Sequence, residues 1–305
     1  MDNLLSHPWA AALIPVFRAF IRFAPPSAAR QRLWQRFVDP YLAWRQHQFV
    51  ARTVAGRIAG NTSDILQQYL YYFGSWEPQV TAFVLRRLQP GDAFVDVGAN
   101  IGYFSLLAAQ RVGARGSVVS IEASPQIFAA LTGNIARNRT RIRAVNLAAS
   151  DARGQLALYS GDEGNCGGTT VAPAAGAVAK TIVQAAPLDE ILTTEEAAAV
   201  RLVKIDVEGA EAAVLTGMRS LLTVGRQDRE FLVEIHPELL GRLGRSADDV
   251  IQPFREAGYQ AYVVENDYDA GSYLWPSRPQ GLRRLREPIT YDTNVVFSRI
   301  DSEEL

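Results

Sequence analysis

In the stretch Phe94-Val95-Asp96-Val97-Gly98-Ala99-Asn100-Ile101-Gly102, a short apolar run rich in β-forming residues ends in a turn that holds two glycines. The residues that follow, 103–112, have the apolar spacing of a helix. A strand, a glycine turn and a helix in this order place backbone N–H groups at the positive end of a helix dipole, where nucleotide-like ligands bind. The stretch therefore predicts the first unit of an α/β sheet with a ligand site at its turn.

From Thr81 onward, short apolar runs alternate with longer helical stretches. This alternation predicts parallel strands joined by crossover helices, that is, a doubly wound α/β sheet. The predicted strands are 93–97, 118–122, 142–147, 201–207, 231–235, 260–265 and 294–299, and the predicted helices are 103–112, 126–138 and 211–224. The segment 161–180 is rich in Gly, Ala and Thr, and we expect a mobile loop there.

Polar side chains stand at the carboxyl ends of five predicted strands in succession. They are Asp96, Glu122, Ser150 with Asp151, Asp206 with Glu208, and Glu234 with His236. Ligands of open α/β sheets bind outside the carboxyl ends of the strands, near the point where the strand order reverses. One such residue alone could be a helix cap, but five strand ends in succession favour a shared site.

The turn departs from the dinucleotide fingerprint G-x-G-x-x-G, whose second glycine lets the main chain approach a pyrophosphate. Asn100 and Tyr103 stand where the second and third glycines belong. An adenosyl cofactor has no phosphate. Glu122, twenty positions after Gly102, suits the hydroxyls of an unmodified ribose, which both cofactor classes contain. The amino-acid end of an adenosyl cofactor needs a turn and a carboxylate, which can come from Asp96, Gly98, Asn100 and Gly102.

Three stretches resemble the FkbM family of methyltransferases. They are the first turn at 94–102, the run Val203-Lys204-Ile205-Asp206-Val207-Glu208-Gly209-Ala210-Glu211, and Glu234-Ile235-His236. The segments 72–78 and 294–297 are also similar, so the resemblance runs from about Thr62 to Arg299. It implies a Rossmann-like seven-stranded methyltransferase sheet whose last strand is antiparallel, with S-adenosyl-L-methionine as cofactor.

The resemblance also implies O-methylation of a hydroxyl on a sugar, glycan or polyketide-type secondary metabolite. It implies that the cofactor is held by Asp96, Gly98, Asn100 and Glu122, with Ser150 and Asp151 near its adenine. We add Gly102 and Asp206 to the predicted cofactor residues. Two rival functions are a nicotinamide-dependent oxidoreductase and a non-catalytic interaction module that keeps the cofactor pocket.

An alcohol is a poor nucleophile at neutral pH, so a base must take its proton or a metal must lower its pKa. Our preferred hypothesis makes His236 or Asp206 the general base, with Lys204 or Glu234 orienting it. In the alternative, Asp206, Glu234 and His236 hold Mg²⁺ or a similar hard cation. With three histidines in the chain, we prefer the metal-free reaction. His236 could instead cap a helix, and Lys204 could be a structural ion-pair partner.

Residues 1–60 are expected to form an N-terminal helical extension, and residues 61–305 the methyltransferase domain. Every charged side chain between Asn3 and Val38 is an arginine, at positions 18, 22, 30, 32 and 36, among apolar residues at helical spacing. Such a helix could contact an anionic membrane surface peripherally, or it could cap the domain or a second subunit in a homodimer. We prefer the cap, and we expect no cleaved signal peptide.

Composition narrows the possible partners. The chain carries 31 basic and 32 acidic residues, so it has no overall positive charge to bind nucleic acid. The single cysteine, Cys166, excludes an internal disulfide framework and predicts a reducing, cytoplasmic location, with membrane association left open. The expected partner is a small-molecule or glycan acceptor.

Three further segments are candidates for contact with the cofactor or acceptor, and the first two have two interpretations each. The aromatic residues of 69–76 could cover the cofactor or acceptor, or pack in the core. The 161–180 loop, with Asn165 and Cys166, could close over the acceptor or merely connect two elements. The insertion 267–292, with Tyr273 and Trp275, is our candidate for acceptor selection.

Overall fold

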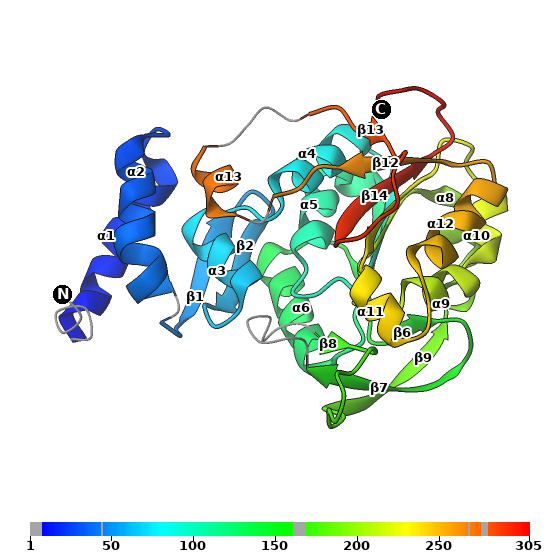
Figure 1. Cartoon of the computed structure of the whole chain (residues 1–305), viewed down its shortest axis with the longest axis horizontal. Coiled ribbons are helices and arrows are strands. Elements are labelled where there is room, and N and C mark those ends of the chain that lie inside the picture. The colour runs from blue at the N-terminus through cyan, green and yellow to red at the C-terminus, as the bar shows by residue number, and fades with distance from the viewer. Residues whose placement is uncertain (1–7, 44, 161–168, 268, 276–279) are drawn as a thin grey trace.

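The computed structural model describes residues 8–43, 45–160, 169–267, 269–275 and 280–305, and its centre is one large sheet (Figure 1). The order of its strands is β13-β12-β14-β11-β10-β3-β4-β5. Five of them are parallel: β3 (Ala93–Val97), β4 (Ser117–Ile121), β5 (Arg143–Val145), β10 (Val200–Ile205) and β11 (Glu230–Ile235). Strand β14 (Thr293–Ser298) runs antiparallel between β11 and β12 (Gln260–Val264). This confirms the seven-stranded sheet with an antiparallel last strand, to which β13 (Arg283–Arg284) adds an edge.

Helices cover both faces of this sheet because its central strands are apolar on both sides. On one face, alternate strand residues such as Val95, Val203 and Val233 pack on four helices: α7 (Leu188–Ile191), α9 (Glu211–Thr216), α10 (Arg219–Thr223) and α12 (Ala247–Glu256). On the other face, Phe94 and Leu202 pack on α4 (Pro78–Arg87) and α5 (Tyr103–Val112). Further helices are α6 (Pro125–Asn138), α8 (Thr194–Ala199) and α11 (Pro237–Arg242).

A second sheet, which the sequence analysis missed, follows β5. Its order is β6-β9-β7-β8, with β6 (Ala148–Ser150), β7 (Gly154–Ser160), β8 (Thr169–Thr170) and β9 (Thr181–Pro187). Part of the segment expected as a loop therefore pairs as strand β8, while Asn165 and Cys166 lie outside the described residues. Strands β6 and β8 are short, and β7 pairs with β9 across more than twenty residues of sequence, so no local turn signal marks the pairing.

The helix predicted over 211–224 is wrong in one respect, because the structure has two short helices, α9 and α10, with a break at Gly217 and Met218. A Cβ atom on Gly217 would lie 1.9 Å from the carbonyl oxygen of Ser150. Gly217 therefore allows the end of α9 to pass directly against β6, which a side chain would prevent.

The N-terminal segment is only partly helical, which corrects the expectation for residues 1–60. Helices α1 (Pro8–Phe23), α2 (Ala28–Leu33) and the π-helix η1 (Trp34–Ala43) precede a hairpin of β1 (Gln48–Thr53) and β2 (Gly56–Asn61). The helices lie at one end of the molecule (Figure 1). Arg18 donates to the carbonyl of Tyr71 in α3 (Ile65–Tyr72), and Arg22 donates to that of Arg52. These contacts are those of a helical cap on the domain.

The aromatic residues of 69–76 and the insertion 267–292 meet in this N-terminal region. Trp34, Tyr69, Tyr72 and Phe73 pack with Tyr273 of α13 (Ala270–Leu274) in one buried cluster. Buried Arg30 donates to the carbonyl of Tyr273. The core-packing interpretation thus describes most of these aromatic side chains. Among the described residues, no helix combines the length and apolar character needed to cross a bilayer.

We predict opposite effects of alanine at two glycines, one after the end of α9 and one inside α6. Gly217→Ala should lower the free energy of unfolding by about 1–3 kcal/mol, because its Cβ overlaps the Ser150 carbonyl. Gly133→Ala, in α6 with no atom near its Cβ position, should raise it by about 1 kcal/mol through helix propensity. Urea denaturation of the two variants measures both effects, and a stable Gly217→Ala variant would contradict the close contact.

Candidate functional site

The turn after β3 is built around three residues in left-handed backbone conformations: Gly98 (φ 81°), Asn100 (φ 48°) and Gly102 (φ 92°). Asparagine tolerates this region better than most side chains. A Cβ atom on Gly98 would lie 1.7 Å from the carbonyl oxygen of Asp206, so the turns after β3 and β10 touch. The strand order reverses between these two strands, where open α/β sheets bind ligands.

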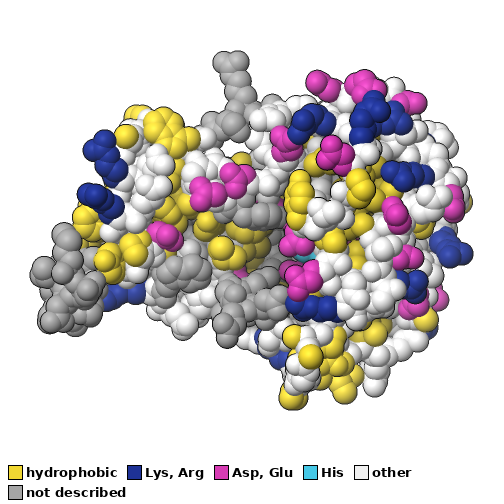
Figure 2. Space-filling model, viewed as in Figure 1, with side chains coloured by type: hydrophobic (Ala, Val, Ile, Leu, Met, Phe, Trp, Pro, Cys, Tyr) yellow, Lys and Arg dark blue, Asp and Glu magenta, His cyan; other side chains and the backbone are white. Residues whose placement is uncertain are grey.

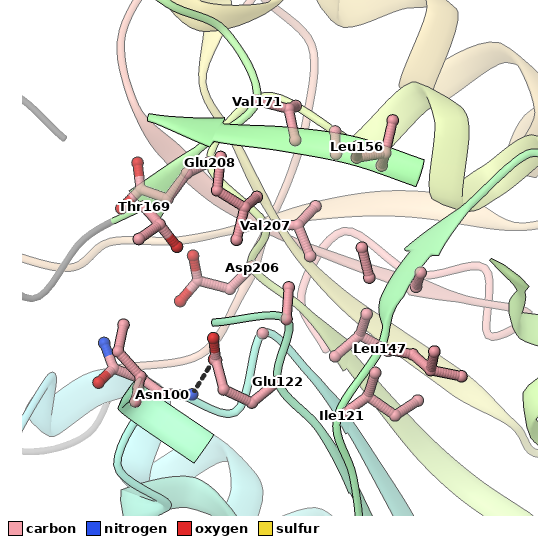
Figure 3. A pocket seen from close by; sticks show the side chains of 18 residues that line it. Asn100, Ile121, Glu122, Leu147, Leu156, Thr169, Val171, Asp206, Val207 and Glu208 are labelled. Atoms are coloured by element: carbon pink, nitrogen blue, oxygen red, sulfur yellow. Dashed lines mark hydrogen bonds between the residues drawn. The ribbon is translucent and has the colours of Figure 1, made fainter. Parts of the chain in front are cut away.

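Glu122, directly after β4, is tied to this turn. Its carboxylate accepts hydrogen bonds from the backbone N–H of Asn100 (3.0 Å) and of Ser124 (2.8 Å). Burial raises the pKa of Glu122 to about 7, although these two hydrogen bonds act in the opposite direction. Figure 3 shows the Glu122 and Asp206 carboxylates turned toward the same space.

That space is a pocket, here called the first pocket, at the carboxyl ends of β3, β4 and β10. Of the predicted cofactor residues, Gly98, Asn100, Glu122 and Asp206 line it. Its apolar walls include Ala149 and Leu156 from the small sheet that the sequence analysis missed. Val171, directly after β8, and Ile121 and Leu147 complete these walls. A polar rim with apolar walls is the usual character of a small-molecule site.

Four other predicted cofactor residues do not line this pocket. Ser150 donates to the Asp151 carboxylate (3.1 Å), while Leu147, Ala148 and Ala149 form the wall. Gly102 is the N-cap of α5.

Asp96, the fourth, is buried beneath the turn, where one carboxylate oxygen accepts from Ser105 Oγ (2.5 Å) and the other has no hydrogen-bond partner. Burial raises its pKa, against the effect of Lys204.

Lys204 is a buried ion-pair partner of Asp206. Its Nζ donates to Asp206 Oδ2 (2.7 Å) and lies 4.9 Å from the centre of the Phe104 ring. Burial alone would lower the pKa of Lys204, but Asp206 and Asp96 raise it above its ordinary value. Burial raises the pKa of Asp206, but Lys204 and His236 outweigh this effect and lower it. Lys204 therefore orients Asp206 and not His236.

His236, after β11, is held by a residue that the sequence analysis did not single out. Its Nδ1 lies 3.3 Å from Asp292 Oδ1, whereas its Nε2 is 4.0 Å from Glu234 Oε2. Burial disfavours the charged imidazole, but Asp292 and Glu234 outweigh it and raise the pKa of His236 to about 11. A pKa raised in this way disfavours His236 as the general base relative to Asp206, and the choice between the two stays a prediction. No local signal links positions 236 and 292, which lie directly after β11 and directly before β14, two strands that are adjacent in the sheet.

A second pocket joins the first at these strand ends. It shares three lining residues with the first pocket, Asn100, Asp206 and Glu208. Its other residues include Trp76, Glu77, Glu234, His236, Arg242 and Asp292. Figure 2 shows acidic side chains gathered beside a histidine in the hollow on this face. The two pockets thus meet at the end of β10.

Comparison with known proteins identifies the family of this chain. The family described as the Methyltransferase FkbM domain matches residues 96–261, from the first turn to β12. The chain belongs to the FkbM methyltransferase family. Membership overturns the nicotinamide-dependent oxidoreductase as an alternative and agrees with the resemblance of the three motifs.

Two curated proteins are similar to this FkbM family member. The 31-O-demethyl-FK506 methyltransferase FkbM of Streptomyces tacrolimicus is 30% identical over 218 residues, which cover 61% of this chain and 80% of that protein. The hexuronic acid methyltransferase AglP of Haloferax volcanii is 29% identical over 194 residues, 63% of this chain and 74% of that protein. Among solved structures, a methyltransferase FkbM from Methylobacillus flagellatus matches with a TM-score of 0.44 at 16% identity, over 80% of this chain and 56% of that chain.

Replacing Asp292 by Asn should lower the pKa of His236 from about 11 toward the ordinary 6.5, because the imidazolium loses a carboxylate partner. The chain has three histidines, so the imidazole C–H signals can be followed individually by NMR over a pH titration. Glu238→Gln removes an exposed carboxylate from the same pocket and serves as the control. An equal response in both variants would contradict the specific Asp292 contact.

Proposed function

We propose that this FkbM family member is an S-adenosyl-L-methionine-dependent O-methyltransferase that acts on a hydroxyl of a sugar, glycan or polyketide-type metabolite. The observation that supports it is the junction of two pockets at Asp206, Glu208 and Asn100. A cofactor in the first pocket and an acceptor in the second would meet at Asp206. Transfer between two bound molecules depends above all on such alignment.

The residues of the first pocket fit the proposed cofactor. Glu122 would accept hydrogen bonds from the ribose hydroxyls, and the apolar walls would hold the adenine. The partnerless buried oxygen of Asp96 suits an ammonium group at the turn. When bound, S-adenosyl-L-methionine supplies a methyl group on a sulfonium, which an in-line displacement moves to the acceptor oxygen as the carbon–sulfur electron pair passes to sulfur.

The chain must also orient the acceptor, whose hydroxyl proton would pass to the Asp206 carboxylate as the new carbon–oxygen bond forms. The Asp206 carboxylate is held by Lys204, and the His236 imidazole by Asp292, at the junction of the pockets. The carboxylates of Glu77, Glu208 and Glu234 can accept hydrogen bonds from acceptor hydroxyls, and Trp76 can pack against a sugar ring. The two relatives are named for a 31-O-demethyl-FK506 substrate and a hexuronic acid, so hydroxyl-bearing acceptors are the class to test.

The direct experiment is transfer of isotope-labelled methyl from S-adenosyl-L-methionine to a panel of sugars, glycans and polyketides. A product with one added O-methyl group is expected. Tight S-adenosylhomocysteine binding without transfer to any member of a broad panel would favour the non-catalytic module instead.

Cofactor affinity should depend on the ionisation of Glu122. Because burial raises its pKa to about 7, the carboxyl is neutral at lower pH and a poorer hydrogen-bond acceptor for ribose. Affinity for S-adenosylhomocysteine should therefore fall as the pH is lowered from about 8 to about 6. Glu122→Gln should weaken binding about tenfold and flatten this dependence. Calorimetry measures both, and an unchanged pH profile in the variant would contradict the role of Glu122.

Asp206→Asn and His236→Ala should each lower kcat about 100-fold or more, because both side chains line the acceptor pocket. His236→Ala should change cofactor affinity little, since His236 does not line the first pocket, whereas Asp206 lines both. Asp248→Asn on α12, which lines neither pocket, is the control. Turnover and S-adenosylhomocysteine binding are measured on the same preparations. Normal turnover in both variants would remove this mechanism.

A further inference from the structure

Three potential metal ligands converge at the ends of β10 and β11. One ligand atom each from Asp206, Glu234 and His236 lies within 4.8 Å of the others. All three residues line the second pocket. Glu234 and His236 are buried, and Asp206 is partly exposed. Because they come from two adjacent parallel strands, the backbone holds them at one sheet edge.

His236 has the arrangement of a metal-binding histidine. Its Nδ1 lies 3.3 Å from Asp292, and a carboxylate at one ring nitrogen fixes the tautomer that leaves the other nitrogen to bind a metal. Nε2 is buried and has no hydrogen-bond partner. The residue is 93% buried, so no water compensates this nitrogen from the outside. Because Nε2 lies 4.0 Å from Glu234 Oε2, this nitrogen points into the cluster.

The two carboxyl groups of the cluster also face each other. One carboxylate oxygen of Asp206 lies within 4.8 Å of one of Glu234. Two carboxylates this close repel each other unless a proton or a cation lies between them. Lys204 contacts Oδ2 of Asp206, but a carboxylate offers about four lone-pair sites, so this contact leaves room for another cation.

The distances suit one divalent ion. Ligand atoms bound to the same octahedral ion at about 2.2 Å lie roughly 3–4.4 Å apart. The 4.0 Å separation of His236 Nε2 and Glu234 Oε2 falls in this range, and the 4.8 Å limit of the group needs only small side-chain rotations. One imidazole and two carboxylates favour ions such as Mn²⁺, which accept both ligand types.

We propose that Asp206, Glu234 and His236 bind one divalent cation of the Mn²⁺ class, whose open coordination positions face the second pocket. The assignment rests on the proposed function for its role, because there the cation would bind the acceptor hydroxyl, lower its pKa and orient it toward the methyl group. Asp292 is a positioning residue that holds the imidazole. The cation would be the electrophile that contacts the acceptor hydroxyl, and it would lie next to Asp206, one of the three residues that line both pockets.

The test measures Mn²⁺ binding to the full chain, which is first treated with a chelator to remove bound metal and then freed of the chelator. Electron paramagnetic resonance of free Mn²⁺ should show one ion bound per chain at micromolar concentration. Glu234→Gln and His236→Ala should abolish this binding. Because these buried substitutions could impair folding, Asp292→Asn, whose side chain is exposed, provides a second test and should raise the Kd about tenfold or more.

Glu238→Gln is the matched control, since it removes one exposed negative charge from the same pocket and none of the three ligands. Mn²⁺ binding should be unchanged in it. Absence of stoichiometric binding, or equal weakening by Glu238→Gln and Asp292→Asn, would overturn the proposal, because diffuse attraction by acidic residues would then explain any Mn²⁺ uptake.

S-adenosylhomocysteine binding, measured on the same samples, separates this proposal from the proposed function. Cofactor binding without Mn²⁺ binding removes only the cation site. Loss of both in the unmodified chain removes the cofactor site as well. With the cation present, kcat should rise and then fall again after chelation, and Asp292→Asn should need more Mn²⁺ for half-maximal rate.

Discussion

The contact between the turns after β3 and β10 determines the geometry of the site. These two parallel strands are neighbours at the point where the strand order of the sheet reverses. Their turns touch where Gly98 faces the carbonyl of Asp206. The backbone N–H of Asp206 donates to Val97, which locks the two strand ends together. Asn100 is thereby placed beside Glu122 on one side and the second pocket on the other. Without this close approach the two pockets would not share a boundary.

Concentrating carboxylates at one sheet edge has an electrostatic cost. Asp96, Asp206 and Glu234 are held around the buried ammonium of Lys204, and burial alone would favour the neutral form of each. Buried charges are tolerated only when they are paired, and clusters with displaced pKa values are typical of functional sites. The pair of Lys204 with Asp206 and the contact of Asp292 with His236 supply this compensation. The same negative surroundings suit a cationic cofactor and a divalent ion.

The small second sheet and the C-terminal segment complete the site from outside the central strands. Leu156 and Val171 close the first pocket, and Thr170 donates to the carbonyl of Glu208 at the pocket junction. Asp292, just before β14, reaches His236 because β14 pairs with β11. These residues come from segments that look like connections in the sequence, yet they shape both pockets.

Much of the central fold could be predicted because its signals are local. Buried parallel strands read as short apolar runs, and the bounds predicted for β3 and α5 agree with the structure. The motif around Asp96 and the strand-end positions of Glu122, Asp206 and His236 were visible for the same reason. The break at Gly217, the hairpin 48–61 and the small sheet were not, since each depends on contacts between distant segments.

The sequence by itself determined the succession of the central strands along the chain, the glycine turn after β3 and the family resemblance, because apolar periodicity and turn chemistry act over a few residues. Only the tertiary structure decided which polar side chains meet. In the structure Lys204 pairs with Asp206, and His236 contacts Asp292. Ser150 and Asp151 do not line the first pocket. Strand register and packing across the sheet determine which buried charges lie next to each other. Neither can be predicted from a short stretch of chain.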